Sequence, residues 1–255
     1  MLNESLRHGL AVNYHENTKK IDNLGLYDNL QQYKIYPSAK TTIVEAHQFY
    51  DKSDFVRVLY KRQSHRLFEK QGITFAQLGK LLSLSFGFNY MTESDIRFRT
   101  YPSAGGRYPI EVYLAILHSE DLSPGIYHYN VVDNSIELIR AGQFENELRG
   151  FYANQPISGD APCYILFSMV LERTMHKYGE RGYRFVYLDA GHMGQNLYLV
   201  AEYLGLGVVA FGGGNASDKD VDELLLINDQ EESFFYGFAV GIPEKNDNHI
   251  RMDNK

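Results

Sequence analysis

Apolar side chains recur at helical spacing in the middle of the stretch from residue 171 to residue 218, and the chain is organised around this stretch. The residues that set the spacing are Met193, Leu197, Val200 and Leu204. Residues 199–203 place more apolar surface on the other sides, and a helix that is apolar nearly all round is usually buried. We therefore expect one long buried helix that ends at Gly205, followed by a buried strand over 206–211.

Small and polar residues interrupt the apolar surface of this helix. The small ones are Ala190, Gly191 and Gly194, which would let a second backbone approach closely. The polar ones are Asp189, His192, Gln195 and Asn196, at positions where core residues are expected. Because buried polar groups need partners, we expect Asp189 and His192 to cap neighbouring elements or hold buried water. For Gln195 and Asn196 two roles stay open, a structural one and contact with a ligand or a partner subunit.

Hydrophobic patterning predicts further helices and strands along the chain. Thr74 and Gln77 form a capping box for a helix that Gly87 ends, and another helix is expected over 55–62. Strands are expected at 111–117, at 163–171, at 234–241, and as a hairpin at 125–131 and 135–140. Short helices are expected near 144–153 and 220–227. Helices and strands interspersed in this way, with a hairpin among them, favour an α+β fold with a mixed or antiparallel central sheet wrapped by helices.

The same patterning divides the chain into three regions. Residues 1–53 are polar and broken, so we expect an irregular N-terminal segment with short elements, packed on the domain that follows. Residues 54–243 form that domain, and residues 244–255 form a polar tail. Inside the domain, residues 88–109 lack periodicity and end in a loop rich in glycine and proline.

Composition and charge exclude several classes of function. The 255 residues carry a net charge of −7, which provides no basic surface for nucleic acid or an anionic membrane. The single cysteine, Cys163, excludes an internal disulfide and a thiolate metal cluster, and the histidines show no metal-ligand spacing. No apolar run reaches membrane-spanning length and the N-terminus lacks the apolar core of a signal peptide, so we expect a cytoplasmic protein.

Three stretches could carry chemistry, although each has a common structural explanation. Arg62, Ser64 and Arg66 suit a phosphate, but a solvated basic helix end gives the same pattern. Glycine-rich turns at 102–106 and 212–214 expose backbone N–H groups that can cradle an anion or a planar ring. Lys177 with Tyr178 could supply a base if burial lowers the pKa of the lysine, or could be an ordinary surface pair.

Taken together, these stretches resemble one family. The joint set is Arg-x-Ser-x-Arg at 62–66, Pro-Ser-Ala-Gly-Gly-Arg-Tyr-Pro at 102–109, Gly-Ile-Tyr-His-Tyr at 125–129, Lys-Tyr at 177–178, Tyr-Arg at 183–184, Asp-Ala-Gly-His at 189–192, Gln-Asn at 195–196 and Leu-Gly-Leu-Gly at 204–207. The set resembles the SagB-type dehydrogenases of the nitroreductase superfamily over residues 55–242, and the stretch from His15 to Lys19 is also typical of them.

The resemblance implies a nitroreductase-like fold and a homodimer that binds FMN at the subunit interface. Arg62, Ser64 and Arg66 would hold the ribityl phosphate and the pyrimidine edge of FMN. Ser103, Ala104 and Gly105 would line the isoalloxazine ring, and Gln195, Gly213 and Gly214 would approach the flavin. Lys177 and Tyr178 match the catalytic pair of the family. Asn215 departs from the pattern, because an aromatic residue is frequent at that position.

The activity implied by the resemblance is FMN-dependent oxidation of peptide thiazolines and oxazolines to thiazoles and oxazoles, in the biosynthesis of modified peptides. The implied partners are a cyclodehydratase complex and its precursor peptide. This chemistry needs one base near the flavin, because the flavin takes a hydride and a proton must also leave. Two alternatives remain: a freestanding NAD(P)H-dependent nitro or quinone reductase, which the Lys-Tyr pair argues against, and a non-catalytic scaffold subunit, which Arg62 and the 103–106 loop argue against.

Overall fold

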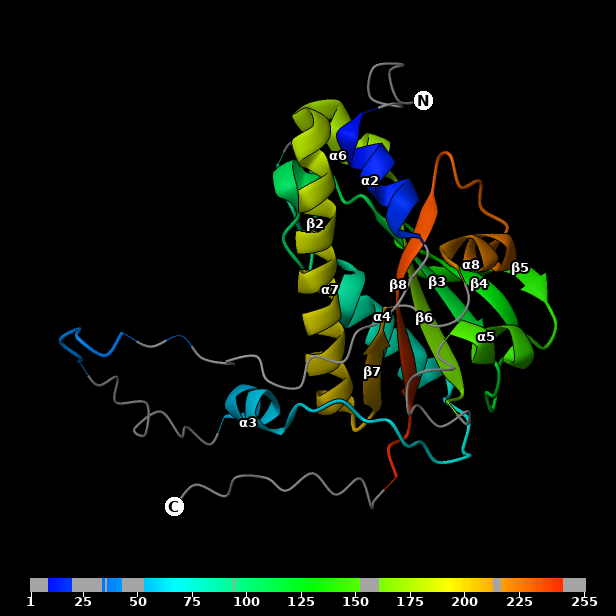
Figure 1. Ribbon diagram of the computed structural model, residues 1–255. Helices are drawn as coiled ribbons and strands as arrows, with labels where there is room; N and C mark the ends of the chain where they lie inside the picture. The colour runs from blue at the N-terminus through cyan, green and yellow to red at the C-terminus, as the bar shows by residue number, and fades with distance from the viewer. Residues whose placement is uncertain are drawn as a thin grey trace.

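A six-stranded antiparallel sheet lies at the centre of the fold, in the order β5-β4-β3-β6-β8-β7 (Figure 1). The computed structural model describes residues 9–19, 34, 36–42, 53–93, 95–151, 161–212 and 217–244. The strands of the sheet are β3 (Ile110–Ile116), β4 (Gly125–Asn130), β5 (Ser135–Ala141), β6 (Cys163–Met169), β7 (Gly207–Phe211) and β8 (Ser233–Gly241). The α+β fold and the hairpin of β4 and β5 are therefore confirmed.

Helices cover both faces of this sheet. On one face lie α4 (Phe75–Phe86) and α7 (Gly182–Leu204), and on the other lie α5 (Glu145–Phe151) and α8 (Asp218–Leu225). The predicted capping box of Thr74 and Gln77 begins α4, with the Gln77 N–H donating to Thr74 Oγ1 over 3.1 Å. Gly205 ends α7 in the left-handed conformation, with φ +74°, as its position predicted.

Two regions differ from what the sequence predicted. The expected strand 163–171 ends at Met169, and α6 (Leu171–Tyr178) begins almost at once. The short helix η3 (Gly179–Arg181) then joins α6 to α7, and Gly182 makes this corner possible because a Cβ there would lie 2.9 Å from the Met175 backbone. In the stretch without periodicity, β1 (Phe88–Met91) pairs with β2 (Arg97–Arg99) as a small separate sheet.

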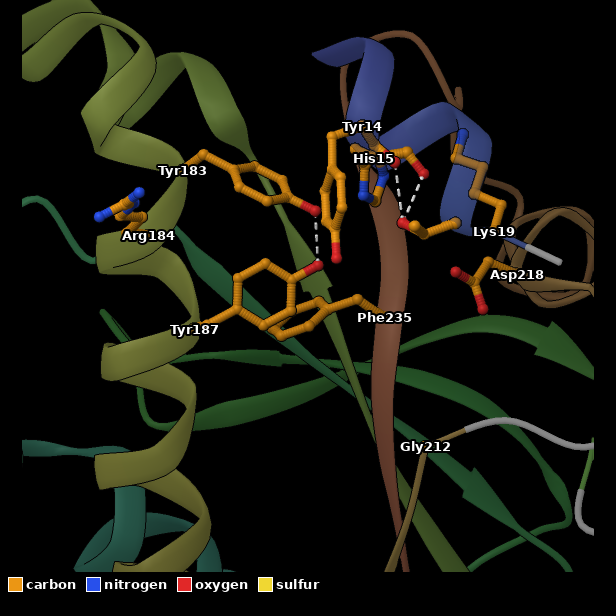
Figure 2. A pocket seen from close by; sticks show the side chains of 10 residues that line it. Tyr14, His15, Lys19, Tyr183, Arg184, Tyr187, Gly212, Asp218 and Phe235 are labelled. Carbon is orange, nitrogen blue, oxygen red and sulfur yellow. Dashed lines mark hydrogen bonds between the residues drawn. The ribbon is translucent and has the colours of Figure 1, made fainter. Parts of the chain in front are cut away.

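Two further helices, α2 and α3, come before α4 in the described part of the chain. The helix α3 (Asp54–Lys61) was expected, and α2 (Leu10–Thr18) is a helix within the described residues of the predicted N-terminal segment. α2 lies beside the N-terminal half of α7, where Tyr14 packs edge-on against Tyr183 with ring centroids 6.0 Å apart (Figure 2). The backbone N–H of Ala11 donates to Glu180 Oε2 over 2.6 Å. Most of residues 1–53 and the tail beyond residue 244 lie outside the described residues.

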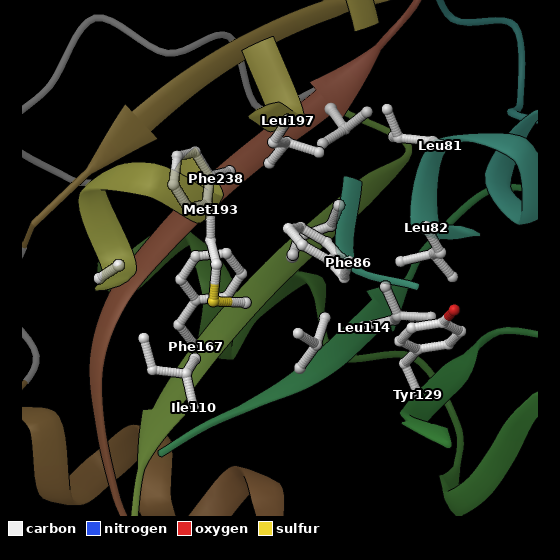
Figure 3. Close-up of a cluster of buried hydrophobic side chains, with 14 of the residues drawn as sticks. Leu81, Leu82, Phe86, Ile110, Leu114, Tyr129, Phe167, Met193, Leu197 and Phe238 are labelled. Atoms are coloured by element: carbon white, nitrogen blue, oxygen red, sulfur yellow. The ribbon is translucent and has the colours of Figure 1, made fainter. Parts of the chain in front are cut away.

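Alternation along β3 builds two separate cores. Val112, Leu114 and Ile116 face α4 and α7, whereas Tyr113 and Leu117 belong to the cluster on the α8 side. Figure 3 shows the first cluster, in which these buried side chains from two helices and three strands meet: Leu81, Leu82, Phe86, Met193, Leu197, Leu114, Phe167 and Phe238. Each large side chain buried here stabilises the fold by about 1.5–3 kcal/mol relative to exposure.

The prediction that α7 is buried on all sides is wrong for one face. Leu188 and Tyr203 are each 59% exposed in the single chain. Two of the small residues, Ala190 and Gly194, face the sheet instead, and a Cβ on Gly194 would lie 3.0 Å from the Phe238 ring. The close approach that they permit is therefore to β8, and Gly191 alone of the three lies on the open face. No described helix is long and apolar enough to span a membrane.

Glycine positions in the sheet and in α4 provide a test of this packing. A Cβ on Gly237 of β8 would overlap the Phe211 ring, so Gly237→Ala should lower the free energy of unfolding by about 1–3 kcal/mol. Gly79 of α4 has nothing within 4 Å of a Cβ, so Gly79→Ala should raise it by about 0.5–1 kcal/mol. Urea unfolding of both variants measures the difference, and equal effects of the two changes would contradict the packing described.

Candidate functional site

The loop from residue 102 to residue 109 is held in a strained conformation. It contains the short helix η2 (Ala104–Gly106), in which Gly105 and Gly106 have φ of +63° and +64°. Tyr108 also has positive φ, at +47°, which is uncommon for a residue other than glycine. Within the loop the Tyr108 N–H donates to Ser103 Oγ over 2.8 Å. Such strain persists only where the surroundings fix the backbone, and it clusters at functional sites.

The carboxylate of Asp189 fixes this loop to α7. Asp189 is buried, and it accepts hydrogen bonds from Ser103 Oγ at 2.5 Å and from the Ala104 N–H at 3.3 Å. Burial raises the pKa of Asp189. The expectation that Asp189 caps a neighbouring element is therefore confirmed. The Ser103 hydroxyl is already engaged with Asp189 and with the Tyr108 N–H, so the expected contact between the loop and a flavin would fall mainly to Ala104 and Gly105.

Lys177 and Tyr178 meet this loop at Gly105. A Cβ placed on Gly105 would lie 2.8 Å from Lys177 Nζ and would overlap the hydroxyl of Tyr178. Lys177 Nζ lies 5.2 Å from the centroid of the Tyr178 ring, and that ring packs edge-on against Phe185 of α7 at 4.9 Å. The structure thus brings together two stretches that are more than 70 residues apart in the sequence. Lys177 is exposed in the single chain, so the described residues do not supply the burial that was expected for a lysine acting as a base.

Arg173 ties the helix that carries Lys177 to the same loop. It lies one turn before Lys177 on α6, donates from Nη1 to the Tyr108 carbonyl over 3.1 Å, and forms an ion pair with Glu111. Glu111 in turn lies 3.1 Å from Nε2 of His128, whose Nδ1 lies 3.0 Å from Glu137. The hydrogen bond to Glu111 is the main reason that the pKa of His128 is raised.

This network spans α6, β3, β4 and β5 and was not predicted from the sequence. Arg173, Glu111 and Glu137 stand in no motif, and His128 lies in the 125–129 stretch, to which no role was assigned. The only available signal was the position of Arg173 one turn before Lys177, and it has meaning only once α6 is known to be a helix.

The Arg62, Ser64 and Arg66 stretch lies against the C-terminal half of α7 and the edge of β7. The Arg62 guanidinium lies 5.5 Å from the Tyr198 ring centroid, and Ser64 Oγ lies 3.2 Å from the Tyr198 hydroxyl. That hydroxyl accepts from the Ala210 N–H at 2.8 Å. His65 lies between Ser64 and Arg66; its N–H donates to the Val208 carbonyl over 3.0 Å and its side chain is buried. Arg62, Ser64 and Arg66 are half-buried.

The two groups of candidate residues lie on opposite sides of α7. Asp189 contacts the 102–109 loop and Tyr198 contacts Arg62 and Ser64. Tyr198 comes nine positions after Asp189, which is about 180° around a helix and roughly 13.5 Å along it. A single ligand beside Arg62 therefore cannot also touch Gly105 of the same chain without passing around the helix.

The other polar residues of α7 divide between structure and surface. Asn196 is structural, since its amide donates to the carbonyls of Ser85 and Thr100 at 3.4 and 3.1 Å. His192 and Gln195 are exposed, so their expected core position was wrong, and they lie on the open face with Leu188. A contact of Gln195 with the flavin stays a prediction.

Two of the expected flavin contacts cannot be placed. Gly213 and Gly214 lie outside the described residues, as does Asn215, and β7 leads to them through Gly212. Among the residues that the structure describes, no group of histidine, cysteine and carboxylate side chains could hold a metal ion.

Comparison with known proteins identifies related chains. The model of the nitroreductase family matches residues 59–242. A nitroreductase of Methanocaldococcus jannaschii, MJ1384, is 33% identical over 172 residues, which is 68% of this chain and 84% of the relative. The microcin B17-processing protein McbC of Escherichia coli is 33% identical over 113 residues, or 42% of each chain, so less than half of McbC is matched.

The solved structure of the Escherichia coli microcin synthetase McbBCD complex with truncated pro-MccB17 contains a similar chain. That chain superimposes with a TM-score of 0.74 at 19% identity and covers 94% of both molecules, which establishes the shared fold. The region matched by the family model contains the 102–109 loop, the α6–α7 corner and the Arg62 stretch. Because this match spans most of the sequence, the chain belongs to the nitroreductase family.

Proposed function

We propose that this protein oxidises thiazoline or oxazoline rings of a precursor peptide to the aromatic azoles, with FMN as the oxidant. The observation that carries the proposal is the contact of Lys177 and Tyr178 with Gly105 of the strained loop. The similarity to McbC, which is described as a processing protein for microcin B17, supports a peptide as the substrate. As a member of its family the chain is an oxidoreductase whose cofactor is FMN.

The Arg62 stretch is chemically suited to the phosphate of FMN. Among the residues that the structure describes, no acidic side chain pairs with Arg62 or Arg66, and both are half-buried. Half-buried guanidinium groups without a carboxylate partner favour a dianionic ligand, and the Ser64 hydroxyl adds a further donor. The cation–π contact with Tyr198 would orient the Arg62 guanidinium before the phosphate binds.

The opposite placement of the two residue groups on α7 supports a homodimer. If the open faces of two α7 helices met, the Arg62 stretch of one chain could lie near the Gly105 loop of the other. Leu188, Tyr203 and Gln195 would then be covered by the second copy. The same pairing would desolvate Lys177, which is exposed in one chain, and would thereby favour the neutral amine that a base requires.

The reaction removes two hydrogens from adjacent ring carbons. When bound, FMN supplies a hydride acceptor, so the electron pair of one C–H bond leaves with the hydride. Lys177 would take the proton from the neighbouring carbon, and the electron pair of that bond becomes the new ring double bond. Tyr178 would hold Lys177 Nζ in place through its ring and hydroxyl, since both groups crowd the same point above Gly105.

Peptide recognition would be shared with a cyclodehydratase complex that forms the azoline. The chain is acidic overall, and the homologous fold of the McbBCD complex is found in a synthetase assembly with a bound precursor. We expect slow oxidation of an azoline peptide by the isolated protein, and an undiminished rate without any partner would contradict this sharing.

Replacing the proposed base tests the reaction directly. Lys177→Ala should retain FMN and lower the rate of azole formation by roughly 10²–10⁴-fold, the usual contribution of a general base, and Tyr178→Phe should have a smaller effect. His176→Ala changes the exposed neighbour on the same helix and serves as the control. The measurement is single-turnover flavin reduction by an azoline peptide at matched FMN content. A normal rate in Lys177→Ala would exclude the lysine as base, and quinone-dependent NADPH oxidation without azoline oxidation would favour a freestanding reductase.

Substitutions at two adjacent glycines distinguish the effect of the contact with Lys177 and Tyr178 from the effect of backbone strain. Gly105→Ala and Gly106→Ala both place alanine at a φ near +64°, so both should lose similar stability. Only the Gly105 Cβ meets Lys177 and Tyr178, whereas nothing lies within 4 Å of a Cβ on Gly106. We expect Gly105→Ala to slow azoline-dependent flavin reduction by roughly tenfold to hundredfold more than Gly106→Ala, because the pair is displaced. Identical rates in the two variants would show that the contact has no catalytic importance.

If Arg62 binds the phosphate of FMN, its removal should lower the affinity for the cofactor. Arg62→Ala should weaken FMN binding by about 1.5–3 kcal/mol, the contribution of a hydrogen bond to a charged group. Arg57→Ala, an exposed arginine of α3 that pairs with Asp54, should leave it unchanged. Flavin fluorescence titration gives both dissociation constants, and light scattering of the loaded protein should give the mass of a dimer. Purification without flavin, with FAD alone, or as a loaded monomer would contradict the assigned site.

A further inference from the structure

A cavity of about 480 Å³ lies between α2, the first turns of α7 and the ends of β7, β8 and α8 (Figure 2). We call it the α2 pocket, after the helix that forms one wall. The residues that matter for its chemistry are Tyr14, His15, Lys19, Tyr183, Tyr187 and Gly212. Its volume falls within the range of small-molecule sites, which is roughly 300–1,000 Å³. The candidate site described above uses none of its side chains.

The walls of the α2 pocket are aromatic. Tyr183 packs edge-on against Tyr14 at 6.0 Å and against Tyr187 at 5.1 Å, and Tyr187 packs edge-on against Phe235 at 5.4 Å. The hydroxyls of Tyr183 and Tyr187 lie 2.8 Å apart and share one hydrogen bond. Tyr14 is 62% exposed and Tyr187 is 43% exposed, so both stand at the edge of the pocket, while Tyr183 is buried. Aromatic walls with hydroxyl groups among them favour a flat ligand that carries hydrogen-bonding atoms.

Two polar side chains, His15 of α2 and Lys19 at its C-terminal end, are buried at this pocket. His15 is 4% exposed, and its Nε2 makes no hydrogen bond among the described residues. Burial, with Lys19 nearby, lowers the pKa of His15 to about 4, so the ring is neutral. Lys19 Nζ is also buried; it lies 3.0 Å from Glu16 Oε1 but makes no directed hydrogen bond. Because buried polar groups are nearly always hydrogen-bonded, His15 Nε2 requires a partner that the described residues do not supply, and Lys19 brings a buried positive charge to the same pocket.

The α2 pocket also adjoins the expected flavin contacts. Gly212 lines it, and the next residues in the chain are Gly213 and Gly214, which are expected to approach the flavin. Its other lining residues from α7 lie within two turns of Phe185, which packs against Tyr178. If Gly213 and Gly214 approach the flavin as expected, a ligand in this pocket would lie near the cofactor.

We propose that the α2 pocket is the subsite for a five-membered heterocycle of the substrate peptide together with its flanking amide. The inference rests on the function proposed above, since the peptide substrate comes from there. The ring would stack among Tyr14, Tyr183 and Tyr187. The ring nitrogen and the amide carbonyl accept hydrogen bonds, and Lys19 Nζ and an Nε2–H of His15 can donate them. α2 is then a wall of the substrate site.

Binding of matched peptides to the full-length FMN-loaded protein tests this inference. The probe is a short peptide with one thiazole between glycines, and its control is the linear peptide with Gly-Cys in place of the ring. Isothermal titration should give at least tenfold tighter binding of the thiazole peptide. Equal affinities would overturn the proposal, because they would mean that the pocket holds only solvent or binds a ligand of another chemical class.

Three variants locate the binding in the α2 pocket. His15→Phe keeps a buried ring but removes Nε2, and it should weaken thiazole-peptide binding about tenfold, the equivalent of one hydrogen bond to a buried group. Tyr14→Ala changes a largely exposed ring and should weaken it several-fold even if His15→Phe does not fold. Asn17→Ala, an exposed position on the same helix that does not line the pocket, should have no effect. Unchanged affinity in both pocket variants, or loss of FMN with unchanged peptide affinity, would overturn the proposal.

Kinetics distinguish failure of this inference from failure of the proposed function. If the unmutated protein oxidises an azoline peptide and both pocket variants keep its KM, the pocket is not the subsite and the function stands. If the unmutated protein binds the thiazole peptide through His15 but oxidises no azoline, the assigned reaction fails and the subsite stands.

Discussion

The packing of α7 against the sheet is the constraint on which the site depends. The side of the helix that carries Met193 and Leu197 fills the core together with Phe86 and Phe238. This packing fixes the rotation of α7, and the rotation decides what its remaining sides can reach. Asp189 thereby faces the 102–109 loop, and Tyr198 faces the Arg62 stretch. Each candidate group is thus attached to the core through one α7 side chain, and a shift of the helix would move both.

Most of the sheet and its covering helices could be predicted because their signals are local. The capping box at Thr74 and the left-handed Gly205 have strong positional preferences, and the turn between β4 and β5 divides two alternating segments. What the sequence could not provide is the direction in which each residue of α7 faces. Spacing alone placed His192 and Gln195 at core positions, although they are exposed, and the apolar Leu188 and Tyr203 gave the impression of burial on all sides.

The candidate site was predictable only where residues adjacent in sequence act together. The arginine–serine stretch and the glycine loop are contiguous, so they could be singled out, while α6 was missed because it is short and largely polar. The contact between Gly105 and Lys177 depends on the corner at Gly182, which no motif marks. The link from Arg173 through Glu111 to His128 crosses three elements, and no spacing along the chain connects these residues.

The Arg62 stretch has a second consequence through its position at the rim of the sheet. β7 is a terminal strand, and the stretch covers its outer side, where the His65 N–H bonds to the Val208 carbonyl. An uncovered strand rim can pair with another molecule and begin aggregation. The segment expected to retain the cofactor phosphate therefore also protects the sheet from intermolecular pairing, so that release of the segment would endanger solubility as well as cofactor binding.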